Sequence, residues 1–415
     1  MRRLPGLPTF AVPLFAVALL APATAHAAED DLPVGDEAPR FVPTAVADGY
    51  YAYHDTAPTG PTGSATHMTT ASRHNEFAVN LAAIGARLEH AKLTGAVVLH
   101  AGTSVDALHA LAPGDREIWK HIQLANVGWK AGAFHFEAGV LPSLVGRESF
   151  VSTSNWNYTR AFIADATPYY VTGARATWRV SPTWSLGAAI FNGWDTHGDR
   201  NATKSGQLRV AWTPSEKLSI ETSALVGQEQ VPLAGRTTPL RFFDDLIVAL
   251  QVHKRVHLAL EAWAGTERNY RFEDPQKGDA RSATMVRHPW FYGGALWGKW
   301  QFGDTVYLAA RAEALSDRAG VMASNGARQS FVPGAVPTGE PFVGQQLAGG
   351  TLTFGWQPHK SFLARVEALH RISDHPFFSG SVTEYSESVA GSSATYVTQA
   401  RRSSTTFVVS AAFSY

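Results

Sequence analysis

The feature that most constrains the fold is the spacing of segments in which apolar and polar residues alternate. Such period-2 alternation, bounded by turn residues, is typical of β-strands, and about sixteen segments of the chain show it. The segments lie near residues 45–55, 76–90, 92–102, 118–130, 134–141, 169–180, 183–194, 204–213, 217–229, 241–253, 256–267, 289–302, 305–316, 345–357, 361–373 and 403–415. The chain is therefore expected to be an all-β protein.

The connections between these segments alternate strictly between short and long. The second and third segments are nearly contiguous, and the later short connections are 131–133, 181–183, 214–216, 254–255, 303–304 and 358–360. The long connections are 56–75, 103–117, 142–168, 195–203, 230–240, 268–288, 317–344 and 374–402. Soluble sandwiches have no reason to gather their long loops at one end, whereas transmembrane barrels have short periplasmic turns and long extracellular loops. The sequence predicts a closed antiparallel transmembrane β-barrel of about sixteen strands.

The two faces of the segments differ as a membrane barrel requires. In 305–316, Leu308 and Ala310 alternate with Arg311 and Glu313. One such segment also fits a soluble sheet with a single buried face. In a barrel, however, a charged residue facing lipid at mid-depth costs about 2–4 kcal/mol, so the charged face must point into a wet lumen. Several tryptophans near the predicted periplasmic turns fit an aromatic girdle; they are Trp129, Trp178, Trp184, Trp212, Trp300 and Trp356.

The N-terminal segment 1–27 has the features of a bacterial secretory signal peptide. Arg2 and Arg3 form a positively charged start, and the apolar run at 10–21 is too short to span a bilayer. Small residues follow in the pattern of a cleavage site. We expect the segment to be removed after export.

The rest of the chain is expected to form one domain. A short periplasmic tail is predicted over 28–47 and the barrel over 48–415. The chain has no cysteine, which excludes disulfides and thiolate metal sites.

The last strand is expected to pair with the first, because an open sheet edge in hydrocarbon would leave backbone groups unsatisfied. Its alternation also resembles the signal read by the outer-membrane barrel assembly machinery, although Tyr415 stands where that signal usually has Phe. The residues predicted to face lipid are Phe407, Val409, Ala411, Phe413 and Tyr415.

Charge and motifs argue against several classes of function. The chain carries 35 basic and 35 acidic residues, so nothing favours binding to nucleic acid. Nucleophile-elbow, zinc-protease, P-loop and dinucleotide-binding motifs are absent from the sequence. No catalytic, cofactor or metal site is therefore predicted. A site assembled from distant loops would leave no such motif, so a loop-based enzyme stays open as an alternative.

Four stretches resemble one known family. They are DGYYAY (48–53), GRESFVSTSNWNYTRAF (146–162), FNGWD (191–195) and KSGQLRVAWTPSEKLSI (204–220). Together they are similar to the OmpL-like, second β-barrel porin family, in the same order along most of the mature chain. The resemblance implies a barrel of the Gram-negative outer membrane, set in lipid and lipopolysaccharide, that lets small hydrophilic solutes diffuse through. The family brings no catalytic residues with it.

The loop at 142–168 is the best candidate for a functional element. Long loops in compact domains are usually functional or disordered, and this one mixes Phe150, Trp156, Tyr158 and Phe162 with charged residues. Aromatic side chains are poorly placed in water, so we expect the loop to fold into the lumen and narrow it. The alternative is an extracellular loop packed against its neighbours. Its charged residues are Arg147, Glu148, Arg160 and Asp165.

Charged residues on the strands are expected to line the pore. Paired across neighbouring strands they would stabilise the wall, and unpaired they would give a weakly anion-preferring channel. The near-balanced total charge favours wall pairing for any single residue. The predicted positions are Arg175, Arg179, Arg209, Glu221, Glu261, Arg311, Glu313, Arg365 and Glu367, with Arg371 on the same face.

Competing interpretations remain open from sequence alone. An energy-coupled transporter would need about 22 strands and a plug domain, for which the chain has no room. A secreted carbohydrate-binding β-protein would explain the aromatic residues. An adhesin would use the loops 317–344 and 374–402, which are rich in Ser, Gly and Thr. By analogy with porins of this size, a homotrimer is also expected.

Overall fold

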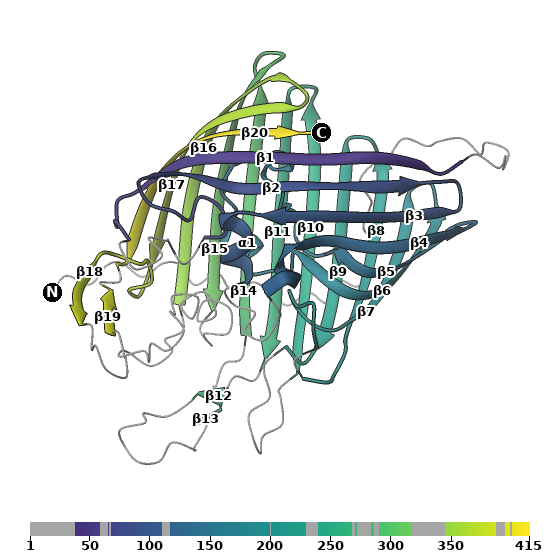
Figure 1. Ribbon diagram of the computed structural model, residues 1–415, viewed down its shortest axis with the longest axis horizontal. Helices are drawn as coiled ribbons and strands as arrows, with labels where there is room; N and C mark the ends of the chain where they lie inside the picture. The colour runs from purple at the N-terminus through teal and green to yellow at the C-terminus, as the bar shows by residue number, and fades with distance from the viewer. Residues whose placement is uncertain are drawn as a thin grey trace.

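Sixteen antiparallel strands close into a single barrel, as predicted (Figure 1). The computed structural model describes residues 38–415 except 59–64, 66–67, 110–116, 200, 230–239, 268–269, 272–283, 286–289, 318–344, 387–394 and 399–400. The barrel strands are β1 (Arg40–His54), β2 (Glu76–Glu89), β3 (Leu93–Ala101), β4 (Ile122–Ala131), β5 (Phe134–Pro142), β6 (Tyr170–Ser181), β7 (Trp184–Phe191), β8 (Ser205–Ser215), β9 (Leu218–Gly227), β10 (Arg241–His253), β11 (Val256–Glu267), β14 (Trp290–Gln301), β15 (Val306–Asp317), β16 (Gln345–His359), β17 (Phe362–Ser373) and β20 (Ser403–Ser414).

Two small hairpins stand outside the barrel sheet. They are formed by β12 (Tyr270–Arg271) with β13 (Thr284–Met285), and by β18 (Val382–Ser386) with β19 (Thr395–Thr398). Both belong to long connections at the end of the barrel opposite the short turns. Loop 317–344, on which the adhesin interpretation partly rests, lies almost wholly outside the described residues.

The chain end is held by the first strand. β1 pairs with β20 from Val46 opposite Ser414 to His54 opposite Thr406. The backbone of Tyr415 exchanges two hydrogen bonds with Ala45, of 2.9 and 3.1 Å. The last strand therefore closes the barrel, as the alternation predicted.

The beginning of β1 differs from the prediction. The strand starts at Arg40, inside the segment 28–47 expected to be a periplasmic tail. The reason is that its first residues continue the ladder with β2, with Arg40 opposite Glu89. The predicted signal peptide 1–27 and the first part of the tail lie outside the described residues.

The two faces of the wall have opposite characters. Outward side chains such as Val366 and Val409 are apolar and 56% and 55% exposed, as expected for a lipid-facing surface. Inward neighbours such as Glu367 and Ser410 are polar and buried. The buried core therefore lies inside the barrel.

Folded loops supply the inner side of this core. The helix α1 (Thr103–His109) places Val105 and Leu108 in a cluster with the inward residues Leu81 and Val98. Shorter helical turns are η1 (Glu117–His121), η2 (Ser152–Ser154) and α2 (Phe162–Asp165). In the part of the chain that the structure describes, no helix is long and apolar enough to cross a membrane.

Replacing Val366 with Arg should destabilise the barrel by about 2–4 kcal/mol, because the guanidinium would face hydrocarbon near mid-strand. Unfolding by urea in lipid vesicles measures this, with Val366→Leu as the control that keeps the side chain apolar. Equal stability of the two variants would contradict the assignment of this face to lipid.

Candidate functional site

Half of the barrel wall is covered from the inside. The inward side chains of β15, β17 and β20 are buried along nearly their whole length, including Tyr307 beside one periplasmic turn and Leu363 beside another, and those of β1 are buried from Val46 onward. A water-filled pore would leave these residues exposed. The covering element is the loop 142–168 that connects β5 and β6.

Wall carboxylates hold the backbone N–H groups of this loop. Glu367 accepts from the amides of Tyr158 at 2.6 Å and Thr159 at 2.9 Å. Glu313 accepts from the amide of Phe162 at 2.5 Å. A buried backbone donor without a partner costs about as much as a lost hydrogen bond, so these contacts make the infolded path stable.

A second set of carboxylates holds the beginning of the loop. Asp245 on β10 accepts from the amide of Gly146 at 2.8 Å, and Glu261 on β11 accepts from the amide of Arg147 at 3.0 Å. The hydroxyl of Ser223 on β9 donates to the carbonyl of Leu144 at 2.9 Å. The loop thus crosses the lumen from β5 toward β9, β10 and β11.

Wall arginines hold the carbonyl groups of the loop. Arg365 donates to the carbonyls of Ser152 at 2.9 Å and Asn155 at 3.2 Å. Arg371 and Arg311 both donate to the carbonyl of Arg160, at 2.7 and 3.2 Å. Guanidinium groups offer several donors in a fixed plane, which suits them to gather carbonyls from a curved loop.

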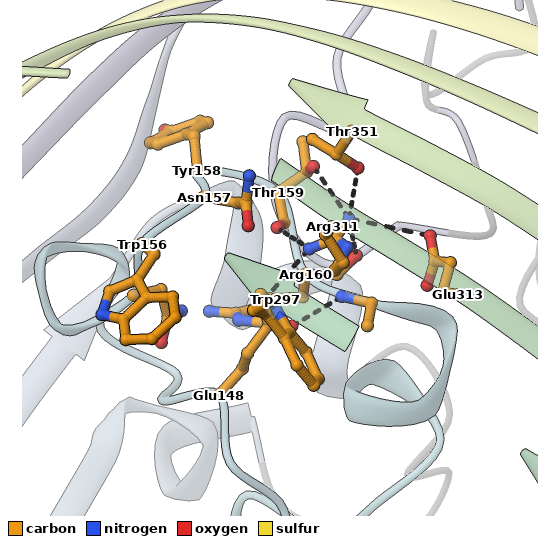
Figure 2. A network of polar contacts seen from close by, with 12 residues as sticks. Glu148, Trp156, Asn157, Tyr158, Thr159, Arg160, Trp297, Arg311, Glu313 and Thr351 are labelled. Carbon is orange, nitrogen blue, oxygen red and sulfur yellow. Dashed lines mark hydrogen bonds and ion pairs between the residues drawn. The ribbon is translucent and has the colours of Figure 1, made fainter. Parts of the chain in front are cut away.

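Glu148 lies at the centre of this network (Figure 2). Its carboxylate accepts from the amide of Ala161 at 2.6 Å, from the indole of Trp297 at 3.0 Å and from Arg311 at 3.1 Å. Both charged partners are fully buried. Removing one partner of such a pair leaves an uncompensated buried charge, so the pair fixes the position of the loop.

The remaining loop charges, Arg160 and Asp165, bind the connection between β1 and β2 as well as residues of their own loop region. Arg160 donates to Thr69 and to the carbonyl of Phe150, and Asp165 accepts from Thr69 and from the hydroxyl of Tyr169. Thr69 belongs to the connection between β1 and β2. The two loops therefore form one packed layer inside the barrel.

Tyr158 joins this layer to the first strand. Its hydroxyl donates to Asp48 at 3.0 Å. Burial raises the pKa of Tyr158 well above its usual value, because the ionised form would lose its hydration. The hydroxyl therefore remains a donor at physiological pH.

The other half of the wall, formed by β2 to β9, is covered only in part. Its inward residues away from the short turns pack against the loop and are buried, among them Leu141, Val171, Phe191 and Leu225. Charged residues nearer the short turns are less covered. Arg175 pairs with Glu137 at 2.7 Å and Arg209 pairs with Glu221 at 2.6 Å, each across neighbouring strands. Arg179 is exposed, and among the described residues it has no ion pair.

Two further basic residues on this wall were missed by the sequence analysis. Arg87 on β2 and Lys130 on β4 are exposed and share the inward face with the buried residues Ala83 and Gly128. Neither takes part in an ion pair with another described residue. Assigning every second residue of β2 and β4 to the inward face, starting from the short turns, would have placed both Arg87 and Lys130 in the lumen.

The predicted pore residues therefore separate into two groups. Arg147, Glu148, Arg160, Glu261, Arg311, Glu313, Arg365 and Glu367 meet at the loop, with Asp165 at its edge. Arg175, Arg179, Arg209 and Glu221 lie on the uncovered wall. The charges of β15 and β17 serve as partners of the loop backbone, and a pore-lining role for the other predicted residues stays a prediction.

Within the described ranges, no group of three or more His, Asp or Glu side chains is arranged to hold a metal ion. The polar contacts of the loop are hydrogen bonds to the wall and to neighbouring loops. The arrangement positions a loop inside a barrel and leaves charged side chains facing the remaining lumen.

Comparisons with solved structures show that this fold is shared. The anion-selective porin from Comamonas acidovorans is 10% identical, with 91% of this chain and 100% of that chain covered and a TM-score of 0.53. The outer membrane channel DcaP of Acinetobacter baumannii is 9% identical, with 91% and 97% covered and a TM-score of 0.53. The outer membrane protein OmpT of Vibrio cholerae, in a trimer form, is 9% identical, with 91% and 100% covered and a TM-score of 0.53.

Sequence comparison gives the family. Against curated protein sequences the chain finds no match. The family described as beta-barrel porin-2, OmpL-like, matches residues 42–414, which is almost the whole barrel. The chain therefore belongs to the OmpL-like β-barrel porin-2 family, and is a porin of the bacterial outer membrane.

Proposed function

We propose that small hydrophilic solutes diffuse passively along the wall formed by β2 to β9, beside the loop 142–168. The observation that carries this proposal is the unequal exposure of the two halves of the lumen. Inward residues of β15, β17 and β20 are buried even beside the short turns, whereas Arg87, Lys130 and Arg179 are exposed near the short turns of the opposite wall. The water path is therefore off-centre.

The charge of this path favours anions. The wall carries Arg87, Lys130 and Arg179 without a paired carboxylate among the described residues, in addition to the pairs of Arg175 and Arg209. Charges that line a narrow pore set its selectivity, and a low-dielectric wall focuses their field. We infer a modest preference for anions over cations.

The loop 142–168 narrows the path in this proposal. It is tied to β9, β10 and β11 at its beginning and to β15 and β17 further along. The loop would then limit the size of the solute while the uncovered wall sets its charge. The channel would work without turnover, since the polar groups of the loop serve to anchor it.

We also propose a homotrimeric assembly and recognition of the last strand during insertion into the membrane. Assembly as a homotrimer fits the barrel architecture, which the trimeric Vibrio cholerae protein shares. The exposed aromatic terminus of β20, with Phe413 and Tyr415 facing outward, would be read by the barrel assembly machinery. Both points rest on the barrel architecture and on the exposure of its last strand.

Changing Arg179 to Glu should move the zero-current potential under a salt gradient toward cation preference, because it reverses an exposed charge on the path. The measurement uses purified, refolded protein in a planar bilayer. Lys360→Glu makes the same change of charge in the exposed turn between β16 and β17, on the covered side, and should shift the potential less. Equal shifts would argue against a path along β2 to β9.

Deleting residues 150–162 should increase the single-channel conductance, because it removes the segment that fills the β15–β17 side of the lumen. An increase of about twofold or more is expected if the loop sets the narrowest section. Heat-modifiable gel mobility verifies that the deletion variant has folded. A folded variant with unchanged conductance would refute the role of the loop as a constriction.

A further inference from the structure

Arg147 differs from the other arginines of the loop network. Its guanidinium lies between two indole rings, 4.2 Å from the centroid of Trp156 and 4.8 Å from that of Trp297. Only its backbone amide forms a hydrogen bond within the described part of the chain, to Glu261. By contrast, the guanidinium groups of Arg311 and Arg365 donate hydrogen bonds to carbonyls of the loop.

A second cation, Lys299 on the barrel wall, lies near the guanidinium of Arg147. It projects inward from β14, one position beyond Trp297 on the same face, and its ammonium sits 4.4 Å from the ring centroid of Tyr307. The charges of Arg147 and Arg365 both repel it. No carboxylate of the described chain pairs with it.

Two neighbouring cations without a shared counter-ion repel each other, more strongly where they are partly removed from water. Here aromatic faces hold them in place: Trp156 and Trp297 for Arg147, and Tyr307 for Lys299. Such cation–π contacts attract a cation to the face of the ring. These contacts hold the two cations without using the N–H donors of Arg147 and Lys299. None of the side-chain nitrogens of these two residues is both fully buried and without a partner. Both side chains are partly exposed, so a solute in the lumen can reach some of these donors.

The nearest carboxylates do not remove this positive charge. Glu148 is bound by Arg311, Trp297 and the amide of Ala161. Glu261 is fully buried and accepts from the amide of Arg147. Both lie close enough to attract the guanidinium of Arg147, whereas Lys299 lacks a corresponding partner among the described residues.

We propose that Lys299 and Arg147 form a binding site for a small oxyanion, a carboxylate or a phosphate, on the inner surface of the loop. A guanidinium fork and a compact ammonium together match the oxygens of either group. The bound anion would accept the donors that the protein leaves open and would neutralise the repulsion between the two cations. The channel would then bind oxyanion-bearing solutes in passing, which is more specific than the general preference for anions on which this inference rests.

Block of the chloride current tests the site. Wild-type protein in a planar bilayer is titrated with inorganic phosphate and, separately, with benzoate, and the half-blocking concentration of each is measured. Lys299→Gln should raise that concentration about fivefold or more, because the charge-assisted contact is lost. Lys299→Arg, which keeps the charge, should restore most of the block.

Lys130→Gln is the matched control, since it removes a lysine from the opposite wall of the same lumen. It should lower the anion preference while changing the half-blocking concentration by about twofold at most. Relief of block by Lys299→Gln alone supports the site, and the probe that blocks at the lower concentration identifies the preferred oxyanion. Equal relief by both variants, or no block of the wild type by either probe, would overturn the proposed site.

A wild-type zero-current potential without anion preference would count against the proposed function instead, because that potential is measured without either probe.

Discussion

The interior of this barrel depends on the need of a buried backbone for hydrogen-bond partners. The loop 142–168 carries its amides and carbonyls into the lumen, where they are removed from water. Side chains of the wall supply the hydrogen-bond partners. Glu367 and Glu313 accept from amides of the loop, while Arg365 and Arg371 donate to its carbonyls. Because orphaned buried backbone groups are rare in folded proteins, the loop path and the wall charges determine one another.

This constraint explains why one barrel has two different inner walls. The charges of β15 and β17 are structural, since they are fully buried and bound to the loop. Of the charges on β2, β4 and β6, Arg175 donates to the carbonyl of Pro142 at 3.1 Å. Arg87, Lys130 and Arg179 are exposed and have no ion pair among the described residues. A buried charge needs both a partner and hydrogen bonds to be tolerated, so the covered wall has little freedom to vary. On the wall formed by β2 to β9, exposed charges such as Arg179 are not held by ion pairs with other described residues, and in our proposal they set the selectivity.

The barrel could be predicted from the sequence. Which inward residues are covered by the loop and which face the open lumen could not. Strand alternation, short turns and the apolar face of β20 follow from local patterns, which survive in any closed barrel. Which inward charges meet the loop depends on a path across the lumen that no local pattern encodes. Arg311 and Arg179 have the same alternation in sequence, yet one is buried under the loop and the other is exposed. The early start of β1 at Arg40 was missed because its ladder with β2 extends past the alternating part.

The most direct test of this account is the water accessibility of the two walls. The chain has no cysteine, so single cysteines introduced at Thr177 on β6 and at Ser410 on β20 would be the only thiols. Thr177 is partly exposed on the open wall, whereas Ser410 is buried on the covered one. A charged, membrane-impermeant thiol reagent should reduce the current of Thr177→Cys and leave that of Ser410→Cys unchanged. Reaction at Ser410→Cys as fast as at Thr177→Cys would contradict an off-centre path bounded by the loop.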